Sequence, residues 1–397
     1  MKSILQKNLS WFENSGVMLP SDGMWGVAER VAVIKDNEAI DKMLNDFPAW
    51  TIHGDYCIME QRRADCNFQS AFLYLLSYEL FGEKKYYDTA VKILDFLYFR
   101  SGLLNRSDAA IPKGAWNWSH IKWTPVVYFD DESWCIFLAL EIARNYPELE
   151  ERYNMKFWAL ELAGELAKGA LRVMAMTERS ESGHWCDLHE NVWKGRLDLP
   201  HWGSLVCMAL ARAYKEDPVP EYLKFIQDYD SYVNEGNDKF NVSEYAYIVI
   251  GSCGAYRYLN DERYLKTAER FGGIIKGKMA ENGNIPAEHY ETPTGENLVD
   301  TIYTANWSLL GLQSLAALNT SFKEPFKKLL DLIAGIQDKT PEKQFSGCWR
   351  GMYDLDTGTW GGGNRFEGGS GSIYTGWTNA PISSVIAMEL LGKNLFS

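Results

Sequence analysis

Two kinds of helix alternate along this chain, and their alternation limits the fold more than any other feature. Residues 65–81 are apolar on nearly all sides, which is typical of a helix buried on every face. Gly82 ends that segment, and residues 84–99 follow with one charged face and one apolar face. The pair predicts a buried helix, a tight turn, and an amphipathic helix that packs outside it.

The same unit recurs along the sequence, as in proteins built from repeats. Further buried helices are predicted at 131–145, 202–215, 243–259 and 300–318, with amphipathic partners at 149–176, 219–234, 261–280 and 322–337. A sixth buried helix, 380–392, has no partner after it, but the amphipathic helix 2–14 can pack outside it and close a ring. We therefore expect an all-α fold, an (α/α)6 barrel formed by residues 1–397 as one domain. An open helical solenoid is the alternative, although solenoids seldom bury one whole set of helices.

Long connections lead from the outer helices to the next inner helices, and they should all lie at one end of the barrel. They span roughly 100–129, 177–201, 281–299 and 338–379. Residues 17–63 are expected to be irregular, apart from a helix around 38–46. Long loops in a compact domain usually carry function, so the sequence predicts a pocket at the N-terminal ends of the inner helices.

The composition favours a sugar as the ligand of that pocket. The chain has 15 Trp and 22 Tyr, many of them in the loop segments, where their rings can stack on sugar rings. The net charge of −13 argues against nucleic acid or an anionic membrane as the partner, although it does not exclude a small anionic substrate. The expected partner is a small-molecule carbohydrate, with no nucleic acid and no membrane.

The cysteines and the N-terminus favour a cytoplasmic location. Seven Cys are scattered without the CxxC spacing of metal sites, and several fall in apolar helical runs, as small buried residues in a reducing compartment would. The first eight residues lack the apolar core of a signal peptide. No run reaches the roughly 18 apolar residues that a membrane span needs.

Two adjacent carboxylates at the start of a predicted inner helix are the first catalytic candidates. Hydrolysis of a glycosidic bond needs two carboxyl groups beside it, one of which holds a proton because burial raises its pKa. Asp130 and Asp131 follow the apolar run that ends at Phe129. An Asp in this place is more often a helix cap, but one cap suffices and a second buried carboxylate costs free energy. One carboxylate is therefore expected to face the cavity while the other caps the helix.

Other carboxylates near predicted helix starts supply the second group. Asp198 precedes the third inner helix, and Asp300 opens the fifth, where pure capping is an equally simple explanation. His201 precedes Trp202 at a helix start, which fits an acid/base or a ligand of sugar hydroxyls as well as a structural histidine. The predicted substrate-binding residues, drawn from the loops and the helix starts, are His201, Trp118, His189, Trp202, Arg350, Trp360, Arg365, Glu367, Tyr374 and Trp377.

No motif for a metal, a cofactor or a nucleophile accompanies these residues. The spacing of His184 and His189 is not a familiar zinc spacing, and HExxH is absent. The glycine-rich segment around Glu367 lacks the GxxxxGK[ST] pattern of a phosphate loop, and no GxSxG or Cys–His signature is present. We expect neither a metal nor a cofactor.

The segment around the paired aspartates resembles a known family. Residues 129–134 (FDDESW), followed by residues 139–144, are similar to the Asp-Asp-x-x-Trp segment of the family 76 α-1,6-mannanases, over some 20–40 residues. This resemblance implies an (α/α)6 barrel with Asp130 and Asp131 as the catalytic pair. The unsaturated glucuronyl hydrolases of families 88 and 105 share that fold, and resemblance to them matches Asp131 and, loosely, Asp198 to their two catalytic aspartates. Family 154 glucuronidases are a further relative in fold.

The sequence thus predicts a glycoside hydrolase that acts on a small oligosaccharide, either uronic-acid-containing or mannose-type. A cytoplasmic sugar 2-epimerase of the N-acylglucosamine type is one alternative, because such epimerases are also (α/α)6 barrels of about this length. They use paired histidines on inner helices, whereas the histidines here are expected in loops. A sugar-binding barrel without catalysis is the other alternative.

Overall fold

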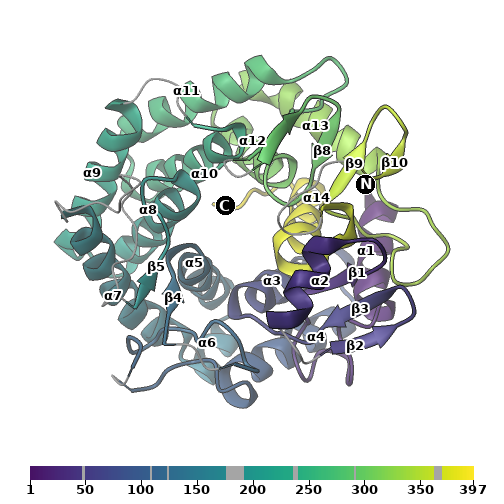
Figure 1. The fold of residues 1–397 in the computed structure, drawn as a ribbon. Helices are drawn as coiled ribbons and strands as arrows, with labels where there is room; N and C mark the ends of the chain where they lie inside the picture. Colours follow the sequence, from purple (N-terminus) through teal and green to yellow (C-terminus); the bar gives the residue numbers. More distant parts are fainter. Residues whose placement is uncertain are drawn as a thin grey trace.

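The inner helices of the barrel surround a common axis in the computed structural model, which describes residues 1–46, 50–107, 110–122, 125–175, 192–235, 240–289, 292–361 and 369–397 (Figure 1). Each of them is buried along most of its length. They are α3 (Ala64–Phe81), α5 (Phe129–Asn145), α8 (Pro200–Glu216), α10 (Val242–Leu259), α12 (Ala305–Leu318) and α14 (Ala380–Leu391).

An outer helix packs against each inner one, and its buried residues lie on a single face. These helices are α1 (Lys2–Asn14), α4 (Lys84–Asp95), α7 (Met155–Ala175), α9 (Pro220–Glu235), α11 (Glu262–Lys278) and α13 (Lys323–Gly335), with the short helix α6 (Pro147–Tyr153) ahead of α7. Gly82 joins α3 to α4 with φ of +70°, a backbone conformation that glycine adopts without a steric cost. The fold is therefore an (α/α)6 barrel, as predicted.

The N-terminal helix α1 closes the ring by packing on α14. The side chain of Asn8 donates a hydrogen bond to Asn379 (2.8 Å) and accepts one from Ser383 (2.7 Å). Leu5 and Phe12 are buried on the same helix. The prediction that residues 2–14 cover the sixth inner helix is confirmed.

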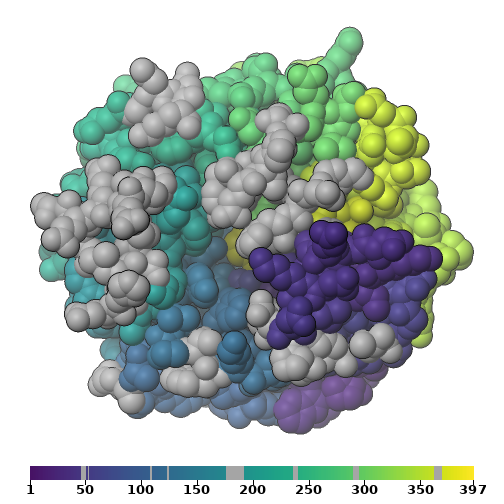
Figure 2. All heavy atoms as spheres, viewed as in Figure 1, coloured from purple at the N-terminus to yellow at the C-terminus, as the bar shows by residue number. Residues whose placement is uncertain are grey.

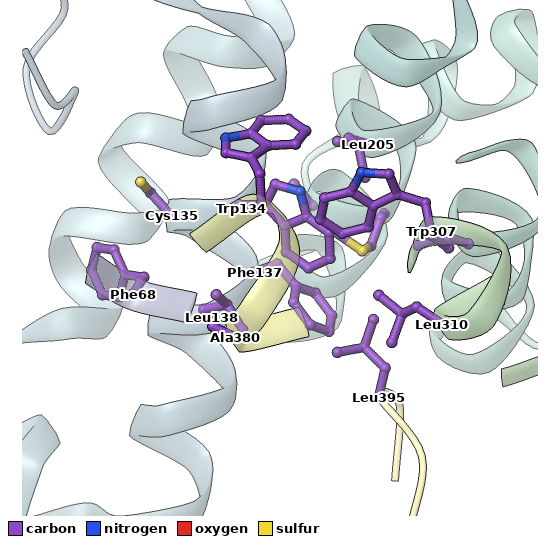
Figure 3. Close-up of a cluster of buried hydrophobic side chains, with 14 of the residues drawn as sticks. Phe68, Trp134, Cys135, Phe137, Leu138, Leu205, Trp307, Leu310, Ala380 and Leu395 are labelled. Carbon is purple, nitrogen blue, oxygen red and sulfur yellow. The ribbon is translucent and has the colours of Figure 1, made fainter. Parts of the chain in front are cut away.

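Aromatic and aliphatic side chains fill the space between the inner helices. Figure 3 shows Trp134 and Trp307 side by side, and their rings stack with centroids 5.4 Å apart. Phe137 lies below them, close to Leu395 of the C-terminal segment, which ends inside the ring (Figures 1 and 3). The core therefore closes the barrel from the end opposite to the strands described next.

Short strands join the helices at the other end, where the sequence predicted only irregular loops. A four-stranded antiparallel sheet has the order β11 (Ser372–Tyr374), β1 (Arg30–Val33), β3 (Tyr56–Met59) and β2 (Trp50–His53), near α2 (Glu38–Asp46). A second sheet has the order β10 (Thr359–Trp360), β9 (Met352–Asp354) and β8 (Leu298–Asp300). Two pairs complete the set: β4 (Val127–Tyr128) with β5 (Trp193–Lys194), and β6 (Ala287–His289) with β7 (Thr292–Gly295). Strands of two to four residues are too short to show an alternating pattern in sequence.

Inner-helix starts differ from the predicted residues by up to five positions, and the differences at the fifth and third inner helices affect the site. The fifth was expected at 300–318, but residues 301–304 form turns and α12 begins at Ala305. The third was expected from residue 202, but α8 begins at Pro200, so that His201 lies in its first turn. Proline is favoured in a first helical turn because it has no N–H to leave unpaired.

Each cysteine in the described ranges is buried, and none of these forms a disulfide. Among the same residues, no helix is both long and apolar enough to cross a bilayer.

Candidate active site

A cavity of about 330 Å³ opens at the N-terminal ends of the inner helices. Figure 2 shows the molecule from the side of the strands, with the surface hollowed near the centre of the ring. The described residues that line the cavity are Arg63, Trp118, Tyr128, Asp130, Asp131, His201, Trp202, Ile302, Tyr303, Tyr374 and Trp377. Its volume lies at the lower end of the range for small-molecule sites.

The two aspartates stand in the first turn of α5. Tyr128 is the N-cap residue and makes no capping hydrogen bond with its side chain. Asp130 and Asp131 both line the cavity, so the expected division into one capping and one cavity-facing carboxylate is wrong. The N–H groups of a first helical turn favour nearby negative charge, which offsets part of the cost of burying two carboxylates.

Arg63 links Asp131 to two other carboxylates. It lies directly before α3, and its Nη2 is 2.5 Å from Oδ1 of Asp131. The same guanidinium contacts Asp65 through Nε and Nη2 (both 3.1 Å) and Glu29 through Nη1 (3.1 Å). Asp65 also accepts a hydrogen bond from Nε1 of Trp377 (2.9 Å). Asp131 is therefore held by a positive charge that is itself fixed from several sides.

His201 and Glu244 form a second polar pair beside the aspartates. Glu244, in the first turn of α10, accepts hydrogen bonds from Nδ1 (2.8 Å) and the backbone N–H (2.7 Å) of His201. Both residues are buried, and His201 lines the cavity. An imidazole fixed through Nδ1 has its Nε2 on the other side of the ring, which suits it to meet a ligand.

The environments of these groups shift their pKa values. Burial raises the pKa of Asp130, against opposing effects of His201 and then Arg63. Burial also raises the pKa of Asp131, and Arg63 opposes it most strongly there. Burial lowers the pKa of His201, but the charge and hydrogen bond of Glu244, together with Asp130, outweigh burial and leave that pKa raised.

The two aspartates should titrate as a coupled pair whose pKa values are raised by burial. Two adjacent buried carboxyls titrate as a pair, and the first proton leaves the group that has the better counter-ion. Burial, together with Asp65 and Asp130, raises the pKa of Asp131 well above its ordinary value, more than that of Asp130 is raised. The contact with the guanidinium of Arg63 at 2.5 Å nevertheless makes Asp131 the better-paired carboxylate, and on this geometry we take it as the group that ionises first. Oδ1 of Asp130 is buried and has no hydrogen-bond partner in the described part of the chain. The remaining proton is therefore best placed on Asp130.

Aromatic rings form most of the remaining wall. Trp118 lies next to Tyr128, with ring centroids 5.9 Å apart, and Trp202 lies against the imidazole of His201 at 3.8 Å. Tyr374 and Trp377 come from the segment that leads into α14. Such rings combine apolar faces with polar groups, as a sugar ring requires.

Two predicted catalytic carboxylates lie outside this cavity. Asp300 is fully buried and accepts hydrogen bonds from the backbone N–H groups of Ile302, Tyr303 and Thr304, so it holds the turn before α12. Asp198 contacts Arg196 at 3.2 Å and does not line the cavity. Asp300 therefore has a structural role, but in the turn that precedes α12 and not as the cap of the helix, whose N-cap residue is Thr304.

The predicted binding residues divide into three groups. His201, Trp118, Trp202, Tyr374 and Trp377 line the cavity. Arg350 is paired with Asp338 at 2.6 Å, and Trp360 packs edge-on against Tyr353, so both lie elsewhere. The predictions for His189, Arg365 and Glu367 fall outside the described residues.

Several residues of the site were not predicted, although their positions carry a signal. Tyr128 directly precedes α5 and Tyr303 lies two residues before α12, and both line the cavity. Glu244, the partner of His201, is in the first turn of α10. The starts of all inner helices meet at one end of an (α/α)6 barrel, so these positions could have been grouped from the sequence. In the described residues, no group of three or more His, Cys, Asp and Glu has the geometry of a metal site.

The fold is similar to that of several solved sugar enzymes, although no family model and no curated protein matches the sequence. The unsaturated glucuronyl hydrolase of Bacillus sp. GL1 superposes with a TM-score of 0.63 at 15% identity, over 100% of this chain and 98% of that one. The cellobiose 2-epimerase of Bacillus thermoamylovorans superposes with a TM-score of 0.60 at 12% identity, over 98% of this chain and 100% of that one. The GH76A α-1,6-mannanase of a Salegentibacter species superposes with a TM-score of 0.55 at 12% identity, over 98% of this chain and 99% of that one. At these identities the likenesses show the fold alone.

Proposed function

We propose that the protein hydrolyses glycosidic bonds in a small oligosaccharide, with Asp130 as general acid and Asp131 as the ionised carboxylate. The observation that carries the proposal is the difference between these neighbours. Asp131 is 2.5 Å from Arg63, whereas Oδ1 of Asp130 has no described partner. Most glycosidases use a pair of carboxyl groups, one protonated and one ionised, whose different surroundings keep them in these two states.

The chemistry follows from the two protonation states. Asp130 would donate its proton to the glycosidic oxygen as the bond to the anomeric carbon breaks. Asp131 would carry negative charge toward the positively charged sugar ring that forms, either directly or through a water molecule that it deprotonates. Arg63 keeps Asp131 ionised and oriented, which makes Arg63 a positioning residue.

The test is a screen of purified protein against aryl glycosides and unsaturated uronic-acid disaccharides. We expect turnover by the wild type and a loss of about a hundredfold or more in Asp131→Asn, which matches the range of general acid–base catalysis. Asp88→Asn is the matched control, because Asp88 is exposed on the outer helix α4 and pairs with Lys84. Unchanged turnover in Asp131→Asn would contradict the proposal.

The role of Asp130 has a separate test in the leaving group. An acid catalyst matters most when the departing oxygen is a poor leaving group. Asp130→Asn should therefore slow alkyl glycosides much more than dinitrophenyl glycosides, whose leaving group needs no proton. An equal loss with both substrates would show that Asp130 is not the acid.

Sugar epimerisation is the second candidate, and the pair of His201 and Glu244 favours it. The imidazole lies in the first turn of an inner helix and in the cavity, not in a loop as expected, and a carboxylate orients it. Such a pair can move a proton at a sugar carbon. An epimerase would incorporate deuterium from D2O into free sugars, survive Asp131→Asn, and fail in His201→Asn. A binding barrel without catalysis would show turnover in neither assay.

A further inference from the structure

Cationic side chains are few in the cavity, and each is already paired with carboxylates. Among the described residues that line it, only Arg63 and His201 can carry positive charge. Asp130 and Asp131 line the same space. The net charge around a bound ligand therefore depends on whether Arg63 and His201 are already neutralised by carboxylates of the protein.

Arg63 is nearly saturated by its own partners. Three carboxylates, Glu29, Asp65 and Asp131, accept hydrogen bonds from four of the five N–H groups of its guanidinium. The rings of Trp118 and Trp377 lie 5.8 and 5.9 Å from its central carbon. A substrate carboxylate could gain Arg63 only by displacing one of these buried partners, which would leave that partner's charge uncompensated.

The other charges near the cavity follow the same rule. His201 is held by Glu244 through both its ring and its backbone. Behind Arg63, Glu29 also pairs with Arg30 (3.2 Å), and the guanidinium of Arg30 lies over the ring of Tyr374. Carboxylates therefore outnumber the described cations around the cavity, in a chain with a net charge of −13.

We propose that this cavity accepts an uncharged sugar ring and rejects a uronate. The inference rests on the proposed function, and it narrows the substrate class that the sequence left open. Hydroxyl groups of a neutral ring can donate hydrogen bonds to Asp131 and to Oδ1 of Asp130, which has no partner among the described residues. A uronate would bring a further negative charge against them, and like charges placed face to face in an interface cost several kcal/mol.

Binding, not turnover, is the direct test. Methyl glycosides of glucose, galactose and mannose are titrated against the wild type by ligand-observed NMR, each beside the uronate of the same configuration. We expect the neutral ring to bind about tenfold more tightly or better in every configuration that binds, because the uronate would bring its negative charge against the carboxylates that line the cavity. Equal or tighter binding of the uronates, or binding of no neutral ring, would overturn the proposal.

Asp131→Asn tests whether charge causes the preference. The change removes one negative charge and keeps the shape, so the ratio of neutral to uronate affinity should fall by about tenfold. Asp88→Asn on the outer surface should leave the ratio unchanged. A ratio that Asp131→Asn leaves unchanged would also overturn the proposal. A protein that binds neutral rings but hydrolyses no glycoside would contradict the proposed hydrolysis and leave this inference standing.

Discussion

Arg212 and Arg63 each centre a buried cluster of charged groups, at opposite ends of the inner helices. At the end away from the cavity, Arg212 contacts Glu141 through Nε (2.6 Å) and Glu216 through Nη1 (2.8 Å), and its Nη2 donates to a backbone carbonyl. Arg144 and Tyr258 donate to Glu141 as well. Each carboxylate in this cluster therefore has several donors.

The cluster at the cavity is built from the same groups but is not balanced. Arg63 serves three carboxylates, and Asp130 stands beside them without a described partner for Oδ1. Burial raises the pKa of Asp130 and Asp131, which line the cavity of about 330 Å³. Glu141 and Arg144 of the Arg212 cluster line a much smaller one, of about 40 Å³. The comparison teaches that a buried cluster in which every carboxylate has cationic donors has a structural role. A cluster with more carboxylates than cations contains carboxyl groups with raised pKa values, which can serve as proton donors in catalysis.

Replacing the arginine of the balanced cluster should give the largest loss of stability. Arg212→Met leaves Glu141 buried without its main counter-ion, so the free energy of unfolding should fall by about 3–5 kcal/mol. Urea denaturation measures the change. At a temperature where the variant is folded, kcat should stay within twofold of the wild type. A loss below about 1 kcal/mol, or a tenfold fall in kcat, would contradict a purely structural role.

The same replacement at the cavity should act mainly on activity. Arg63→Met removes the charge that keeps Asp131 ionised, so kcat should fall by about a hundredfold or more. The freed carboxyls then have higher pKa values in the folded state, and the variant binds more protons folded than unfolded. Its stability should therefore decrease as pH rises from 5 to 8, relative to the wild type. A stability deficit that is the same at both pH values would contradict this account.

The activity of the wild type should depend on pH through Asp130. Its raised pKa extends the pH range over which the acid is protonated, and activity should fall on the alkaline side as the proton is lost. The profile of kcat/KM with an alkyl glycoside measures this limb. In Asp130→Asn, the residual turnover of a dinitrophenyl glycoside should not fall on the alkaline side of the pH profile. An alkaline fall that persists in this variant would mean that another group causes it.

The architecture was predictable because burial and periodicity are local properties of the sequence. The apolar run 65–81 and the charged face of 84–99 each indicate where a helix lies, and a spare amphipathic helix at the N-terminus indicates how the ring closes. The short strands were not predictable, since β1 and β11 pair residues that are more than 300 positions apart. Two to four residues carry too little pattern for such a pairing to show.

The site was predictable only in part, for a related reason. Asp130 and Asp131 stand out because two acids follow an apolar run, and the structure places both in the cavity. Asp300 has the same local signal, yet its carboxylate is used by the turn that follows it. Arg63 has one local partner, Asp65, but its contacts with Glu29 and Asp131 join residues 34 and 68 positions apart, and no local pattern contains those contacts.

Replacement of Glu132 should give the smallest change in stability among these variants. It also tests whether a buried, protonated carboxyl beside the cavity affects stability without taking part in catalysis. Glu132 is buried next to Asp131 and accepts a hydrogen bond from the backbone N–H of Trp116 (2.9 Å), while its Oε2 has no described partner. Burial raises its pKa well above the ordinary value, against the hydrogen bond from Trp116. The folded state therefore binds this proton more tightly than the unfolded state does, and stability must fall as pH rises above the unfolded value of about 4.3.

Glu132→Gln should remove that decline while keeping the shape of the side chain. Each unit of difference between the folded and unfolded pKa corresponds to about 1.4 kcal/mol. The free energy of unfolding of the variant at pH 8 should therefore be no lower than that of the wild type, and higher by up to roughly 1 kcal/mol. Urea denaturation at pH 5 and 8 measures this, with Glu324→Gln on the exposed face of α13 as the control. Because Glu132 does not line the cavity, kcat should change little. A variant less stable than the wild type at pH 8 would mean that Glu132 is ionised and paired, and the negative excess at the cavity would then be larger than its described partners indicate.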